Sequence, residues 1–309
     1  MMKHKILILG GTGFIGSELV NALRLNRDVQ LMLLIRTRTN YFDLEDFDTI
    51  TGDLGSFDLS QILRFKPRVI IHLARMRGRG RLGRGLASKR GESANWRIIR
   101  WLKRKLPETR VIYVSGSLVY GDSTSPVYES SVLNPTGFAR EYLRAEIPWV
   151  EAQMRKALDI CIVRPGWIVG SGSWFHSNFV KPALRDSAVP IYGSGHNLMN
   201  IIDVRDCASL IARAGLSEKI PEIINLVGPT AAITQSTFAS LVAERMKMPT
   251  MHVHERTTRG WFSDRAAWEA LTSSIPICSG HELFYSDFNY KAPTIEESIE
   301  HHLSCGGTT

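Results

Sequence analysis

Three glycines near the amino terminus have the spacing of a phosphate-binding turn. Gly10, Gly13 and Gly16 recur every three residues, directly after an apolar run and directly before a run with helical spacing. Glycine lets the backbone turn tightly and approach a pyrophosphate, and the next helix offers unpaired N–H groups to the same anion. The pattern therefore predicts dinucleotide binding. The candidate contacts are Gly10, Thr12, Gly13, Phe14, Ile15 and Gly16.

The elements that must position this turn recur along the chain. Apolar runs predict strands at residues 5–9, 29–35, 49–54, 68–74, 110–114, 159–163 and 223–227. Helical patterns occupy residues 17–23, 59–65, 93–106, 137–158 and 235–246. Apolar strands that alternate with helices are typical of a parallel sheet covered on both faces. The predicted fold class is therefore α/β, a Rossmann-type doubly wound parallel sheet with a smaller C-terminal substrate lobe.

The alternation becomes irregular after Pro165, where Gly, Pro, Trp and His are more frequent. We predict a dinucleotide-binding domain over residues 1–165, with returning segments near 200–230, and a substrate-binding lobe over 166–309. No apolar run approaches the roughly 18 residues that span a bilayer. The four cysteines are widely spaced and fit reduced thiols. We expect a cytoplasmic protein with no membrane contact and, since His252 and His254 lack a nearby third ligand, no metal site.

The end of the second predicted strand carries basic residues where a dinucleotide fold meets the adenosine ribose. An acidic residue there would accept a hydrogen bond from the 2′-hydroxyl, but the sequence has Arg36 and Arg38. Arginine pairs well with a 2′-phosphate. The alternative is that both arginines are solvated. We interpret the pair as a preference for NADP(H) over NAD(H).

Several blocks in this order resemble the extended short-chain dehydrogenase/reductase family, which includes sugar-nucleotide epimerases and dehydratases. Besides the glycine turn, the blocks are Gly52-Asp53-Leu54, His72-Leu73-Ala74, Val119-Tyr120-Gly121, Arg164-Pro165, residues 202–208 and residues 292–297. The resemblance implies that Asp53 and Leu54 lie by the adenine, and Leu73 and Ala74 along the pyrophosphate and ribose. It also implies that Asn95 lies beneath the active site, that Pro165, Trp167 and Ile168 lie beside the nicotinamide, and that the protein is a homodimer.

The catalytic positions depart from the pattern of that family. The family has Ser or Thr four residues before the tyrosine of the Val-Tyr-Gly block, and then Tyr-x-x-x-Lys on the next helix. In this register Gly116 replaces the serine, Phe138 the tyrosine and Tyr142 the lysine. Phe138 has no ionisable proton, and a phenol without a lysine nearby has a pKa near ~10, which makes it a poor base. The remaining candidates are Tyr142, which could also bond the nicotinamide ribose, and Ser115 or Ser117.

These substitutions leave more than one function open. The protein is either an NAD(P)-dependent oxidoreductase with a non-standard proton donor or a non-catalytic cofactor-binding protein with a structural or regulatory role. A third alternative is a sugar-nucleotide epimerase or dehydratase, but Met199 stands where those enzymes carry an arginine for the diphosphate. We therefore favour a small organic substrate, carbonyl or ring-bearing. Trp167, Trp174 and Phe175 are expected near it, or else in the core.

The positive charge is concentrated in one segment. Residues 64–110 contain sixteen Lys and Arg against two Glu, so the rest of the chain is net negative although the whole carries +8. Arg75–Gly85, where Arg and Gly alternate, is predicted to be a loop. It could be a lid that attracts phosphates or carboxylates, or a solvated loop. Nucleic-acid binding is the third alternative, disfavoured because no aromatic residues are interleaved.

Overall fold

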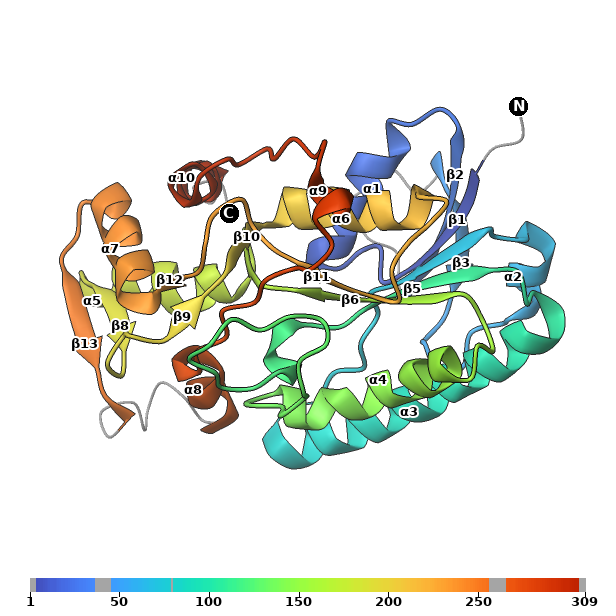
Figure 1. Cartoon of the computed structure of the whole chain (residues 1–309), viewed down its shortest axis with the longest axis horizontal. Helices are drawn as coiled ribbons and strands as arrows, with labels where there is room; N and C mark the ends of the chain where they lie inside the picture. The colour runs from blue at the N-terminus through green and yellow to red at the C-terminus, as the bar shows by residue number, and fades with distance from the viewer. Residues whose placement is uncertain (1–3, 37–45, 79, 256–264, 306–309) are drawn as a thin grey trace. The chain divides into compact units, whose positions relative to one another are not determined.

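The computed structural model describes residues 4–36, 46–78, 80–255 and 265–305. A seven-stranded sheet has the order β11-β6-β5-β4-β1-β2-β3 (Figure 1). The pairs from β6 to β3 are parallel. The strands are β1 (His4–Leu9), β2 (Val29–Ile35), β3 (Asp48–Thr51), β4 (Val69–His72), β5 (Arg110–Val114), β6 (Ile160–Pro165) and β11 (Ile223–Leu226). The predicted doubly wound α/β fold is confirmed.

The strands at the centre of the sheet are buried on both faces. Residues Ile6 to Leu9 of β1 are fully buried, and Ile6 is paired with Leu31 of β2 and Val69 of β4. Because helices cover both faces, these strands are continuous apolar runs rather than alternating ones. The strand order reverses between β1 and β4, and in open α/β sheets ligands bind at the carboxyl ends of strands at such a point.

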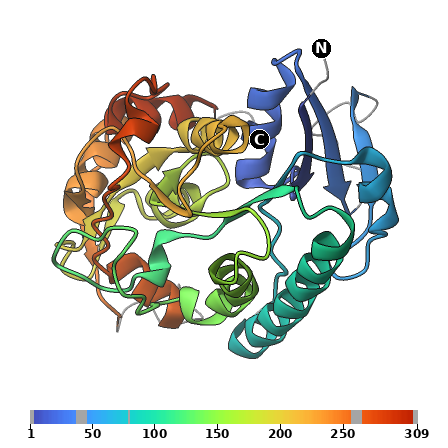
Figure 2. The same ribbon diagram turned by 45° about the vertical axis from the view of Figure 1, so that its right-hand side comes forward.

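Helices on the two faces of the sheet complete this layer arrangement. Figure 1 shows α1 and α6 on one side and α3 and α4 on the other, and Figure 2 shows α3 and α4 side by side. The helices with a role here are α1 (Phe14–Arg24), α2 (Ser60–Phe65), α3 (Gly80–Lys105), α4 (Ala139–Met154) and α6 (Val204–Leu216).

Helix α3 corrects two predictions. It begins at Gly80 rather than at residue 93, so most of the Arg75–Gly85 segment is helical and not a loop. Alternating glycines disfavour a helix locally, each by roughly 1 kcal/mol relative to alanine. Contacts with α4 offset this cost, since Arg84 forms an ion pair with Glu141 and Ser88 donates a hydrogen bond to the Glu141 carbonyl.

The chain divides into two compact units. The first contains residues 1–115, 141–164 and 208–224, and the second contains 116–140, 165–207 and 225–309. Residues 116–140 therefore belong to the second unit, not to the first domain as predicted. Backbone hydrogen bonds explain this difference, since Ser123 N–H donates to Ser274 O (2.7 Å) and Val127 N–H to Pro276 O (3.0 Å).

The second unit has short sheets and its own core. Its two-stranded pairs are β10 with β7, β12 with β9 and β13 with β8. Its elements are β7 (Trp167–Val169), α5 (Lys181–Asp186), β8 (Val189–Tyr192), β9 (Leu198–Met199), β10 (Ile201–Asp203), β12 (Ile233–Thr234), α7 (Gln235–Met246), β13 (Thr250–Val253), α8 (Arg265–Thr272), α9 (Glu282–Tyr285) and α10 (Ile295–Cys305), with short turns of helix at Ser117–Val119 and His176–Val180.

Candidate functional site

The glycine turn between β1 and α1 is a close-packed cradle. Gly10 has a φ of +94°, a conformation that favours glycine, and its added Cβ would lie 2.9 Å from the Ala74 nitrogen. A Cβ on Gly16 would lie 2.8 Å from Gly11 Cα and closer still to the Gly10 carbonyl oxygen. The Gly13 N–H closes the turn on the Gly10 carbonyl at 3.0 Å. A side chain at position 10 or 16 would collide with the neighbouring backbone, so glycine is what allows the turn, the start of α1 and the end of β4 to pack closely.

The first turn of α1 is suited to an anion. Gly13 is the N-cap, no described side chain caps the helix, and its first turn contains no acidic residue. The amino-terminal N–H groups around Phe14 and Ile15 are therefore left for a ligand, at the positive end of the helix dipole. Thr12, Phe14 and Ile15 are half-buried on this turn. The residues present thus fit the pyrophosphate of a dinucleotide.

The neighbouring strand ends carry the residues expected around the adenosine. Arg36 directly follows β2 and is exposed, whereas Arg38 lies outside the described residues. After β3, Asp53 is exposed and accepts a hydrogen bond from the Gly55 N–H at 3.0 Å, and Leu54 is buried. The Asp53 carboxylate is therefore held in a tight turn, with further acceptor capacity open to solvent.

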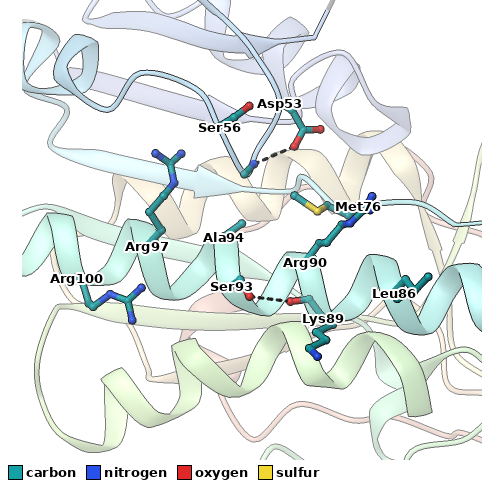
Figure 3. A pocket seen from close by; sticks show the side chains of 11 residues that line it. Asp53, Ser56, Met76, Leu86, Lys89, Arg90, Ser93, Ala94, Arg97 and Arg100 are labelled. Atoms are coloured by element: carbon teal, nitrogen blue, oxygen red, sulfur yellow. Dashed lines mark hydrogen bonds between the residues drawn. The ribbon is translucent and has the colours of Figure 1, made fainter.

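A groove of about 640 Å³ lies between the turn that contains Asp53, Met76 and the basic face of α3 (Figure 3). Asp53 and Ser56 lie on one wall, and Arg90 and Arg97 rise toward them from α3. The full lining is Asp53, Gly55, Ser56, Met76, Leu86, Lys89, Arg90, Ser93, Ala94, Arg97 and Arg100. The lining thus contains one carboxylate and four cations, a charge distribution that favours an anionic ligand.

The end of β4 connects the glycine turn to α3 through a buried histidine. Leu73 and Ala74 follow β4 directly, and Ala74 packs against Gly10. His72 Nε2 lies 2.9 Å from Asn95 Oδ1, and Asn95 Nδ2 donates to the Ala145 carbonyl at 2.7 Å. Burial, opposed by the Asn95 hydrogen bond, lowers the pKa of His72 to about 4. Asn95 thus joins β4, α3 and α4, and it is buried beneath this part of the unit.

Arg75 places a cation against the phenol of Tyr142. Its guanidinium carbon lies 4.4 Å from the centroid of the Tyr142 ring, and its Nη2 donates to the Ser115 carbonyl at 2.6 Å. Helix α4 carries Tyr142, and the segment after β4 carries Arg75, so two elements far apart in sequence form this pair. The expectation that Tyr142 lacks a cation is therefore wrong, because arginine, not lysine, supplies the charge.

The surroundings of Tyr142 keep its phenol protonated. Burial of the ring and, more weakly, the Glu146 carboxylate raise its pKa to about 12, while the charge and hydrogen bonding of Arg75 act in the opposite direction. At neutral pH this half-buried phenol is a hydrogen-bond donor rather than a base. The raised pKa therefore keeps the Tyr142 phenol in its protonated form, in which it can donate a hydrogen bond but cannot accept a proton as a base.

Ser115 belongs to a buried polar network. Its hydroxyl donates to the Glu146 carboxylate, which also accepts a hydrogen bond from Arg164 Nη2 at 2.7 Å. The Glu146 and Arg164 side chains are only 1% and 2% exposed. The Ser115 hydroxyl is bonded to Glu146, and the Ser115 backbone carbonyl accepts a hydrogen bond from Arg75. Ser115 therefore connects the network to the Arg75–Tyr142 pair.

The other predicted residues lie in the second unit. Ser117 is buried in the helical turn Ser117–Val119, and Phe138 is half-buried against the core of that unit. Pro165 ends β6, while Trp167 is buried and Ile168 half-buried on β7. The structure therefore places Ser117 and Phe138 in a different compact unit from Ser115 and Tyr142.

Most aromatic residues expected near a substrate pack into the core of the second unit. Phe175 is buried against Phe238, and the Trp167 and Trp174 rings lie 4.7 Å apart. Met199 on β9 is fully buried, so it contributes no contact to a phosphate. Core packing accounts for Phe175, whereas Trp174 is half-buried against the same core.

No group of three or more His, Cys, Asp or Glu side chains that could hold a metal lies within the described ranges. Within those ranges, no helix combines the length and apolar character needed to cross a membrane.

Comparisons with known proteins agree with this fold. The model of the NAD dependent epimerase/dehydratase family matches residues 6–227. The bovine epimerase family protein SDR39U1 is 26% identical over 252 residues, covering 79% of this chain and 81% of the relative. The structure of human SDR39U1 with NADPH covers 97% of this chain and 99% of that protein, with a TM-score of 0.76 and 18% identity. UDP-glucuronic acid 4-epimerase from Bacillus cereus in complex with NAD covers 99% of both chains, with a TM-score of 0.77 and 21% identity. This chain belongs to the NAD dependent epimerase/dehydratase family.

Proposed function

We propose that this protein is an NADP(H)-dependent oxidoreductase that reduces a small organic carbonyl or ring-bearing compound, with Tyr142 as the proton donor. The observation that carries the proposal is the Arg75 guanidinium 4.4 Å from the Tyr142 ring. The chain lacks the tyrosine and lysine of related enzymes at positions 138 and 142, but it retains a phenol beside a cation.

The first unit contains the residues that would hold the cofactor. The glycine turn and the amino terminus of α1 fit the pyrophosphate, Asp53 and Leu54 the adenine, and Arg36 a 2′-phosphate. When bound, the nicotinamide would donate or accept the hydride. Support for NADP(H) comes from the exposed Arg36 and from the human relative, which binds NADPH, although the Bacillus cereus epimerase is bound to NAD.

The Arg75–Tyr142 pair would supply the proton. Reduction of a carbonyl needs a donor at the oxygen, and a phenol with a pKa of about 12 is fully protonated at neutral pH. As the proton leaves, negative charge develops on the Tyr142 oxygen, and the adjacent guanidinium stabilises it. The backbone carbonyl of Ser115 accepts a hydrogen bond from Arg75, so Ser115 would position Arg75 beside Tyr142.

Position 199 supports the proposed substrate class, because it carries methionine instead of an arginine that would bind a diphosphate. Sugar-nucleotide enzymes hold a diphosphate with a cation, whereas Met199 is apolar and fully buried. This supports a substrate without a diphosphate. The epimerases named among the relatives favour the sugar-nucleotide alternative, so UDP-sugars belong in any substrate screen.

A non-catalytic role is the competing function, and Phe138 is the observation that favours it. Phe138 has no proton to give, and it packs against an apolar core. Stopped-flow absorbance of NADPH with a panel of aldehydes, ketones, enones and UDP-sugars distinguishes the two functions. The proposal predicts NADPH oxidation with at least one of these compounds. Tight NADPH binding without oxidation by any compound would support the non-catalytic function.

A matched set of variants tests the proton donor. Tyr142→Phe removes only the hydroxyl, and general acid catalysis typically contributes 10²–10⁴-fold, so kcat should fall by at least about 10²-fold while the NADPH Kd changes little. Arg75→Lys should retain more activity than Arg75→Met, because only lysine preserves the charge. Equal activity of Arg75→Lys and Arg75→Met would remove Arg75 from the mechanism.

A further inference from the structure

Helix α3 carries a row of cations along one side. Lys89, Arg90, Arg97, Arg100 and Arg104 recur at spacings that keep them within one stripe of an α-helix, and we call them the α3 stripe. At 1.5 Å per residue the stripe is about 22 Å long. Its length exceeds that of a single phosphate site, so it is suited to an extended anion.

Most of this charge is not neutralised within the described part of the chain. Lys89, Arg90, Arg100 and Arg104 are exposed, and none of them forms an ion pair with a described residue. Glu92, the acid within α3, pairs with Arg144 of α4 and so faces away from the stripe. Within the described ranges, the stripe therefore presents a positive potential to solvent.

A wall opposite the stripe makes the surface concave. Arg97 fixes this wall, because its guanidinium donates to the Phe57 carbonyl at 3.1 Å and lies over the Phe57 ring. Arg90 and Arg100 border the resulting groove of about 640 Å³. Figure 3 shows Asp53 at the Arg90 end of the groove and Arg100 at the opposite end. An anion would therefore be held most strongly toward Arg100 and Arg104, away from Asp53.

We propose that the α3 stripe binds the phosphate backbone of a nucleic acid without sequence preference. Three of its four exposed cations are arginines, whose planar fork matches phosphate oxygens, whereas Arg97 is bonded to the Phe57 carbonyl. The residues that line the groove include no aromatic side chain, so the ligand is held through its phosphates rather than by base stacking. Asp53, which we assign to the adenine of the cofactor, lies at the Arg90 end of this groove. A nucleic acid held toward Arg100 and Arg104 therefore does not depend on the oxidoreductase function.

Two other anionic partners fit the surface less well. A bilayer surface is flat and cannot enter a groove between two walls, although Leu82 and Leu86 are exposed near the amino terminus of α3. An acidic protein partner would need an apolar interface core, and the stripe offers charged side chains instead. Nucleic-acid interfaces are polar and strongly positive, as this one is.

Fluorescence anisotropy with a labelled 20-nucleotide RNA of mixed sequence tests the proposal. Single strands lose about 0.7 in log K per phosphate contact for each tenfold rise in salt. For roughly four contacts, the plot of log K against log salt should have a slope near −3. Arg90→Gln/Arg100→Gln/Arg104→Gln should weaken binding about 10²-fold at 0.1 M salt and bring the slope to about −1.

A charge-matched control removes three exposed cations from other surfaces. Arg27→Gln/Lys219→Gln/Lys291→Gln lowers the net charge equally and should change RNA affinity less than threefold, with circular dichroism and melting temperature checking that both variants fold. Equal weakening in both variants, or binding that does not depend on salt, would overturn the proposal. So would tighter binding to phosphatidylserine vesicles or polyglutamate than to RNA. Similar affinity for an RNA of another sequence is expected, and strong discrimination between sequences would contradict backbone binding.

Discussion

Gly16→Ala should disable the glycine turn without unfolding the protein. The new methyl group would lie 2.8 Å from Gly11 Cα, whereas ordinary contact begins near 3.4 Å, and it would lie closer still to the Gly10 carbonyl oxygen. The turn and the start of α1 must therefore separate by at least about 0.6 Å. Neither neighbour can move as a flexible side chain would, because both are backbone.

The displacement has a direct consequence for affinity. An N–H···O bond near 2.9 Å would lengthen to roughly 3.5 Å, outside the usual range. A hydrogen bond to a charged group contributes about 1.5–3 kcal/mol, and each 1.4 kcal/mol is tenfold in Kd. Loss of one such bond to the pyrophosphate should raise the NADPH Kd by at least about tenfold.

Energy transfer from tryptophan to bound NADPH measures this Kd. The matched control is Gly85→Ala on α3, where an added Cβ meets nothing within 4 Å. This control should bind NADPH normally and gain roughly 0.5–1 kcal/mol in stability, since alanine is the better helix former. If folded Gly16→Ala binds NADPH as tightly as the wild type, the turn is not the pyrophosphate site.

Three further predictions concern buried charge and pH. Glu146→Gln leaves Arg164 without its buried counterion and should lower the free energy of unfolding by about 3 kcal/mol in urea, whereas Glu151→Gln, at the exposed pair with Arg155, should change it by less than ~1 kcal/mol. His72 has a folded pKa of about 4 against 6.5 unfolded, so protonation favours the unfolded chain. Its contribution of about 3 kcal/mol is complete above pH 6.5 and lost as the pH falls to 4, and His72→Asn should remove that part of the pH dependence; an unchanged profile would contradict the assignment. Because the pKa of Tyr142 is about 12, the rate of carbonyl reduction should show no loss from ionisation of this phenol up to pH 10, and a fall near pH 8 that Tyr142→Phe abolishes would refute that value.

Local patterns determined much of the fold. The second and fifth strands, Val29–Ile35 and Arg110–Val114, and the helix Gln235–Met246 have the predicted bounds, because each is a short run with a clear period or continuous apolar character. The predicted glycine turn also lies between a strand that ends at Leu9 and a helix that begins at Phe14. These features depend on neighbours in sequence, which a single chain reveals directly.

Features that depend on contacts through space were missed. Glycines at positions 83 and 85 indicate a loop, but contacts of Arg84 and Ser88 with α4 hold the segment in a helix. Nothing in the sequence pairs Arg75 with Tyr142, since 66 intervening residues separate them. The one usable signal was the position of Arg75 directly after the His72-Leu73-Ala74 block, at the end of a strand that borders the switch point. Likewise, only the fold shows that the Ser115 hydroxyl donates its hydrogen bond to Glu146.

The most direct test of the proposed mechanism is the kcat for NADPH-dependent carbonyl reduction by the wild type and Tyr142→Phe, measured beside their NADPH Kd values. We expect the variant to lose at least about 10²-fold in kcat while its NADPH Kd stays within twofold. Equal kcat values in the two proteins would contradict this mechanism.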